Sequence, residues 1–94
     1  MKSNYRGIIA YASAFVSFVI PKIEVEEIIL FGSVARGEAT KESDIDLFFN
    51  VKNKEGETKK ILKESLAKFH KSQLYEQFSL KGIKNPISIE VGNL

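Results

Sequence analysis

The sequence lacks cysteine, carries little net charge and has no hydrophobic run long enough to span a bilayer. Without cysteine it can form neither a disulfide framework nor a thiolate metal site, and it is compatible with the reducing cytoplasm, where we expect the protein. A net charge of +2 does not by itself indicate a nucleic-acid-binding protein. With 94 residues and 44% hydrophobic content, the composition is typical of one small domain covering residues 1–94.

The longest hydrophobic stretch, residues 8–20, lies near the N-terminus and superficially resembles a signal peptide. The small-residue pattern Ala12-Ser13-Ala14 falls inside this stretch, so cleavage there would leave too short a hydrophobic region. Instead, apolar side chains recur with the spacing of one helix face, at Ile8, Tyr11, Ala12, Phe15, Phe18 and Val19. We therefore expect a helix over about 4–20, capped by Ser3 or Asn4, that packs on a sheet and has no membrane role.

A short apolar run at 28–31, rich in β-branched residues, predicts a buried strand that ends at Gly32. Glycine adopts backbone angles that other residues avoid and has no side chain, so a phosphate can approach the main chain closely. Ser33 follows at the expected N-cap of a helical turn over 34–36, whose free N–H groups would attract anions. Arg36 adds a planar guanidinium suited to phosphate oxygens. Gly32, Ser33 and Arg36 are therefore the candidate phosphate-binding residues.

Two aspartates alternate at the start of the next predicted strand, which covers 44–51. Because side chains alternate along a strand, Asp44 and Asp46 are expected on one face, and apolar residues fill the other at Ile45, Leu47, Phe49 and Val51. Two neighbouring carboxylates repel each other, so this placement calls for a cation. Magnesium bound to substrate phosphates is the usual partner of such a pair, which makes both aspartates candidate metal ligands.

Together the two motifs resemble the DNA polymerase β-type nucleotidyltransferase superfamily, and most closely its small stand-alone members, the minimal nucleotidyltransferases. The family pattern is Gly-Ser followed after a short interval by Asp-x-Asp, which Gly32-Ser33 and Asp44-Ile45-Asp46 reproduce. The resemblance extends from about Glu24 onward, so we expect a catalytic core at about 24–94. It implies an α/β (α+β) fold, in which a palm-like mixed sheet of about three strands has helices packed on it.

The family also needs a third carboxylate on a later strand. The last segment with strand character is 86–91, where apolar residues alternate with Ser88 and Glu90. Glu90 is therefore the candidate third carboxylate, although most relatives carry aspartate there. The resemblance implies that Asp44, Asp46 and Glu90 are catalytic and hold two magnesium ions. The second and third strands should then be neighbours.

The remaining segments predict connecting structure. Residues 50–56 are polar and indicate a loop, 57–78 have the spacing of one amphipathic helix, and 79–85 contain a turn before Pro86. The predicted helix over 57–78 is rich in lysine. Lysines exposed to solvent are common on helix surfaces, so RNA binding is the weaker alternative. The expected order is helix, strand, short helix, strand, helix, strand.

The resemblance implies transfer of a nucleoside monophosphate, with AMP from ATP favoured, to a hydroxyl of a partner macromolecule. Many small relatives act as antitoxins that adenylylate a helical HEPN-type toxin, so a partner of that kind, or a second copy of this chain, is expected. A non-catalytic nucleotide- or partner-binding subunit with a relic site is the alternative. Modification of RNA or of a small molecule would fit the same site.

Overall fold

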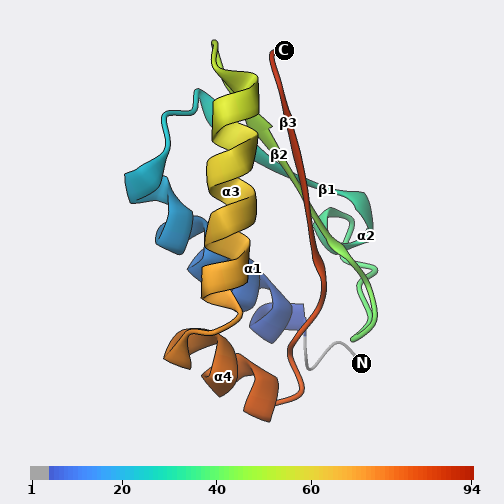
Figure 1. Ribbon diagram of the computed structural model, residues 1–94. Helices are drawn as coiled ribbons and strands as arrows, with labels where there is room; N and C mark the ends of the chain where they lie inside the picture. The colour runs from blue at the N-terminus through green and yellow to red at the C-terminus, as the bar shows by residue number, and fades with distance from the viewer. Residues whose placement is uncertain (1–4) are drawn as a thin grey trace.

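The computed structural model describes residues 5–94, which form a three-stranded sheet with helices on one face (Figure 1). The predicted cap residues, Ser3 and Asn4, lie outside the described residues. The elements in chain order are α1 (Tyr5–Val19), the 3-10 turn η2 (Ile20–Lys22), β1 (Glu27–Phe31), α2 (Gly32–Ala35), β2 (Ile45–Asn50), α3 (Glu55–Phe69), α4 (Gln73–Leu80) and β3 (Ile87–Gly92). This arrangement confirms the predicted small sheet with helices packed on it.

The sheet is mixed, with the strand order β1-β2-β3. Strand β2 pairs antiparallel with β1 and parallel with β3. Parallel neighbours need a long crossover connection, which α3 and α4 provide here. The prediction that the second and third strands are neighbours is confirmed.

The core lies between the sheet and its helices. The stripe predicted on α1 is buried at Ile8, Tyr11, Ala12, Phe15 and Val19. Strand β2 buries every second residue, at Ile45, Leu47 and Phe49, as the predicted alternation requires. Phe69 of α3 packs edge-on against Phe15, with ring centroids 5.4 Å apart. Because α1 and α3 share this core, they hold one face of the sheet fixed.

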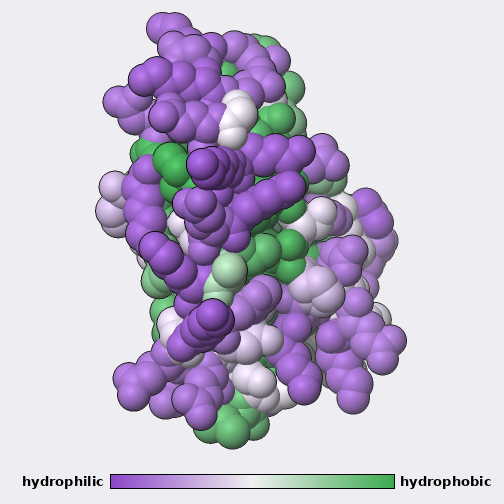
Figure 2. Space-filling model, in the orientation of Figure 1, coloured by the Kyte–Doolittle hydropathy of each residue, from purple (hydrophilic) through white to green (hydrophobic). Residues whose placement is uncertain are grey.

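The predicted single helix over 57–78 is wrong, since two helices occupy this segment. Ser72 marks the break: its Oγ accepts a hydrogen bond from the Tyr75 amide at 3.1 Å and donates one to the Phe69 carbonyl at 2.6 Å. The first of these bonds caps the start of α4. Figure 2 shows the hydrophilic side chains that cover most of the face on which α3 lies. No helix within residues 5–94 is long and apolar enough to cross a membrane.

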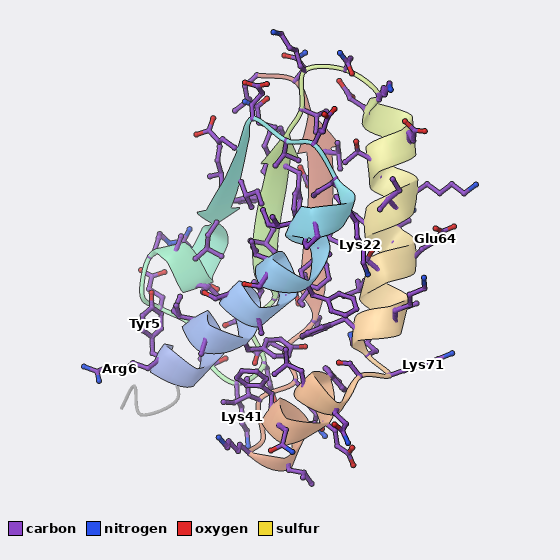
Figure 3. The ribbon with its side chains drawn as sticks, turned by 90° about the vertical axis from the view of Figure 1, so that its left-hand side faces the viewer. Tyr5, Arg6, Lys22, Lys41, Glu64 and Lys71 are labelled. Carbon is purple, nitrogen blue, oxygen red and sulfur yellow. The ribbon has the colours of Figure 1, made fainter. Side chains whose placement is uncertain are left out.

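The opposite side of the sheet, which we call the outer face, has no helix over it in the described part of the chain (Figures 1 and 3). Along each strand, every second side chain faces α1 and α3 and is the more buried. The side chains between them are more exposed and form the outer face. Strand pairing arranges it in three rows across the sheet: Phe31, Asp46 and Ser88; Ile29, Phe48 and Glu90; and Glu27, Asn50 and Gly92. The candidate carboxylates on β2 and β3 therefore share an accessible surface.

Candidate nucleotide and metal site

The turn that follows β1 brings Gly32 against the side chain of Asp46. Phe31 and Asp46 are cross-strand partners, so the chain that leaves β1 passes beside the aspartate carboxylate. Gly32 has a φ of +79°, in the left-handed region that favours glycine. A Cβ at this position would overlap Asp46 Oδ2 and lie 3.2 Å from Asp46 Cγ. The turn therefore needs glycine both for its backbone conformation and for the space that the carboxylate occupies.

Helix α2 is a single turn that begins at Gly32, with Phe31 as its N-cap and no side-chain cap. The prediction that Ser33 would be the N-cap is therefore wrong, and Ser33 is the second helical residue. Val34 is fully buried and anchors the turn in the core, and its carbonyl accepts a 2.8 Å hydrogen bond from the Tyr5 hydroxyl (Figure 3). No local sequence pattern indicated Tyr5, which lies 29 residues away on α1. These two contacts fix the direction in which the turn presents its amides.

Arg36 follows α2 on the surface. Its Nε donates a 2.9 Å hydrogen bond to Glu38 Oε1, and both side chains are more than half exposed. Exposed pairs of this kind contribute little to stability. Because the pair engages only Nε, the two terminal nitrogens of the guanidinium can bind phosphate oxygens.

The two predicted aspartates occupy different backbone settings. Asp46 lies within β2 and is half-buried on the outer face, whereas Asp44 is exposed and precedes the first residue of the strand. Strand pairing thus holds Asp46 directly, while the position of Asp44 depends on the loop that enters β2. Their carboxylate oxygens are the ligand type that magnesium prefers, and a site of two carboxylates completed by substrate phosphates is common for this ion. A metal and phosphates bound at the Asp46 carboxylate would lie beside the main chain of Gly32, which fits that arrangement.

Glu90 is not brought to the two aspartates. Its partner on β2 is Phe48, whereas the residue of β3 opposite Asp46 is Ser88. Glu90 is thus displaced by two residues, about 7 Å along the strand. It still shares the outer face with Asp46, and long side chains can span such a diagonal. In residues 5–94, no group of three His, Cys, Asp or Glu side chains is assembled to hold a metal. The role of Glu90 stays a prediction.

A family model described as nucleotidyltransferase domain matches residues 13–90, which is most of the chain. The chain belongs to this family. The match contains the Gly32-Ser33 turn and both aspartates, so the motifs that carried the resemblance lie inside the recognised domain. This confirms the predicted superfamily and fits a minimal nucleotidyltransferase. Searches of curated proteins and of solved structures found no significant match.

Membership assigns a general chemistry to the nucleotidyltransferase domain. The family transfers nucleotidyl groups and generally uses a nucleoside triphosphate and a divalent metal. The side chains of this site agree with that chemistry, because carboxylates that could bind a cation adjoin a glycine turn that a phosphate can approach. A nucleoside triphosphate is therefore the expected substrate of this domain.

Proposed function

We propose that this domain transfers a nucleoside monophosphate, AMP from ATP in preference, to a hydroxyl group of a partner macromolecule. The observation that carries the proposal is the contact between the Asp46 carboxylate and the main chain of Gly32. It joins a candidate metal ligand to a turn where phosphates can approach the backbone. Sequence spacing predicts the two motifs separately, and their contact supports one shared site.

Each phosphate-binding residue has a separate role in the proposed reaction. The Gly32 main chain and the Ser33 hydroxyl bind the β- and γ-phosphates, which orients the α-phosphorus for in-line attack. Arg36 neutralises charge on the departing pyrophosphate. The acceptor oxygen forms a bond to the α-phosphorus as the bond to the bridging oxygen breaks, and the acceptor proton passes to solvent.

The carboxylates form the metal-binding half of the proposed site. Asp44 and Asp46 would hold the magnesium ion that accompanies the triphosphate, and Asp46 with Glu90 would hold a second. Such ions neutralise charge on the phosphates and lower the pKa of the attacking hydroxyl. The outer face on which Asp46 and Glu90 lie is open to an acceptor, which supports a macromolecular substrate. A HEPN-type toxin remains the acceptor that the resemblance predicts, and a second copy of this chain remains the alternative partner.

One observation favours a second function, that of a non-catalytic nucleotide- or partner-binding subunit. The β3 residue opposite Asp46 is Ser88, which cannot supply the negative charge of a third carboxylate. In that case the Gly32 turn and the two aspartates would bind a metal nucleotide without transferring it. The two functions differ in whether Glu90 supports catalysis of nucleotidyl transfer.

Calorimetric titration with ATP, in magnesium and in EDTA, tests the binding site. Wild type should bind ATP only with magnesium, and an Asp44→Asn/Asp46→Asn double variant should lose this binding without unfolding. Glu64→Gln, which removes an exposed carboxylate from α3, is the control and should bind as wild type does. Persistent binding in the double variant, or none in wild type, would contradict the proposed site.

Glu90→Gln distinguishes the enzyme from the binding subunit. The enzyme reading predicts normal magnesium-dependent ATP binding by this variant together with loss of pyrophosphate release in the presence of an acceptor. If wild type binds ATP but releases no pyrophosphate with any helical toxin partner, the result contradicts the enzyme hypothesis and supports a non-catalytic binding subunit.

A further inference from the structure

Asp44 needs a support that the sheet does not provide. Strand β2 begins one residue later, and its first paired residue is Ile45, opposite Ile87 of β3. Asp44 lies at the end of an exposed loop whose own hydrogen bonds are short-range, such as that from the Thr40 amide to Ser43 Oγ at 2.8 Å. These contacts shape the turn but do not attach it to the domain.

The side chain of Asn85 makes that attachment. Asn85 is 2% exposed and lies two residues before β3. Its Nδ2 donates to the Ser43 carbonyl at 2.8 Å and to the Thr40 carbonyl at 3.2 Å, which uses both of its hydrogens on one loop. These contacts span more than forty residues of sequence. Asn85 therefore fastens the loop before Asp44 to the start of β3.

The geometry fixes Asp44 from both sides. The Ser43 carbonyl and the Asp44 amide belong to one planar peptide group, so holding that oxygen also orients the Asp44 nitrogen. On the other side, the Ile45 amide donates a 2.8 Å hydrogen bond to the Pro86 carbonyl. Consecutive residues, Asn85 and Pro86, thus hold the two peptide groups that flank Asp44.

The main chain of Asn85 also contacts the core. The Tyr11 hydroxyl on α1 donates to the Asn85 carbonyl at 3.1 Å, and Tyr11 is fully buried. The Asn85 Oδ1 atom is buried with no hydrogen-bond partner in the part of the chain that the structure describes. An unpaired buried acceptor is unfavourable by about 1–3 kcal/mol. The two hydrogen bonds that Nδ2 donates to the loop explain why an amide side chain occupies this position.

We infer that Asn85 is a positioning residue, which holds Asp44 where it can bind the metal of the nucleotide. The inference rests on the proposed function, because it assigns a role through Asp44. It adds a residue that reasoning from the sequence missed: Asn85-Pro86 indicated only a turn before the last strand. No local pattern shows that the asparagine side chain reaches back to residues 40–43.

A double-mutant cycle tests the inference. Asn85→Ala should weaken magnesium-dependent ATP binding about tenfold, within the range for groups coupled through one hydrogen-bond network. Because Asn85 acts through Asp44, Asp44→Asn/Asn85→Ala should bind ATP no more weakly than Asp44→Asn alone. Tyr11→Phe is the matched control, since it removes the other hydrogen bond of Asn85 but leaves both bonds to the loop. It should bind as wild type does at a temperature where all variants are folded.

The outcomes separate the inference from the proposed function. If Asn85→Ala weakens binding by the same factor with and without Asp44, the effect is general destabilisation and the inference is wrong. If wild type shows no magnesium-dependent ATP binding, the proposed function fails, and amide NMR spectra then decide the inference. Asn85→Ala should shift or broaden the resonances of residues 40–45 more than Tyr11→Phe does, and unchanged resonances would overturn it.

Discussion

A methyl group added at Gly32 should weaken nucleotide binding about 10–100-fold while the domain stays folded. Gly32 and Gly37 both have left-handed backbone angles, with φ of +79° and +76°, but only Gly32 adjoins the site. A Cβ at Gly32 would overlap Asp46 Oδ2, whereas a Cβ at Gly37 meets nothing within 4 Å. Gly37→Ala therefore reproduces the backbone strain of Gly32→Ala without displacing the carboxylate.

The expected loss of stability has two contributions, the strained backbone and the overlap with the Asp46 carboxylate. A left-handed alanine is disfavoured by about 1–2 kcal/mol, and both variants share this term. Gly32→Ala must also rotate the Asp46 side chain away from its preferred geometry, which is unfavourable by about 0.5–1.5 kcal/mol more. Gly32→Ala should thus be the less stable variant by about 1 kcal/mol, or about 4–8 °C in Tm for a domain of this size. Both variants should remain folded at 25 °C.

Binding should separate the variants far more than stability does. Displacing Asp46 disturbs a proposed metal ligand, and disturbances around metal sites typically weaken affinity about 10–100-fold. Calorimetric titration with ATP and magnesium should show this loss for Gly32→Ala and none for Gly37→Ala, with folding followed by urea denaturation. Normal binding by Gly32→Ala would refute the argument that Asp46 and Gly32 form one site. An equal loss in Gly37→Ala would show that turn strain, and not the carboxylate, is responsible.

Three further predictions concern stability. Burial, and secondarily the nearby Tyr75, raises the pKa of Tyr11 from 10.0 to about 12, so Tyr11 favours folding below pH 10 and loses this contribution as the pH rises to 12. In urea denaturation, the unfolding free energy of wild type should fall by about 2 kcal/mol more than that of Tyr11→Phe across that range, and parallel losses would contradict the prediction. Ser72→Ala removes the cap of α4 and should lower the unfolding free energy by about 1 kcal/mol, a loss that Ser72→Asn should largely avoid. Phe49→Ala leaves a cavity in the core and should lower it by about 3–5 kcal/mol, whereas Phe49→Leu should lower it much less.

The helices and strands were largely predictable from local patterns. The apolar stripe of α1 and the alternation along β2 each reflect burial of one face of a regular element, so the period of the sequence reports the structure. The break between α3 and α4 was missed because no glycine or proline interrupts residues 57–78. Only the Ser72 cap interrupts the backbone pattern, and a lone serine is a weak signal.

The sequence by itself determined which kind of domain this is. A glycine turn after β1 and two aspartates at the start of β2 identify a nucleotidyltransferase domain. These motifs can be read from the sequence because each depends on local backbone conformation and on the alternation of side chains along a strand. Tertiary structure alone decided how the parts meet. The register of β3 sets Ser88, and not Glu90, opposite Asp46, and register depends on packing between strands distant in the chain. The contacts of Asn85 with the loop before Asp44 likewise span more than forty residues, so no local pattern could specify them.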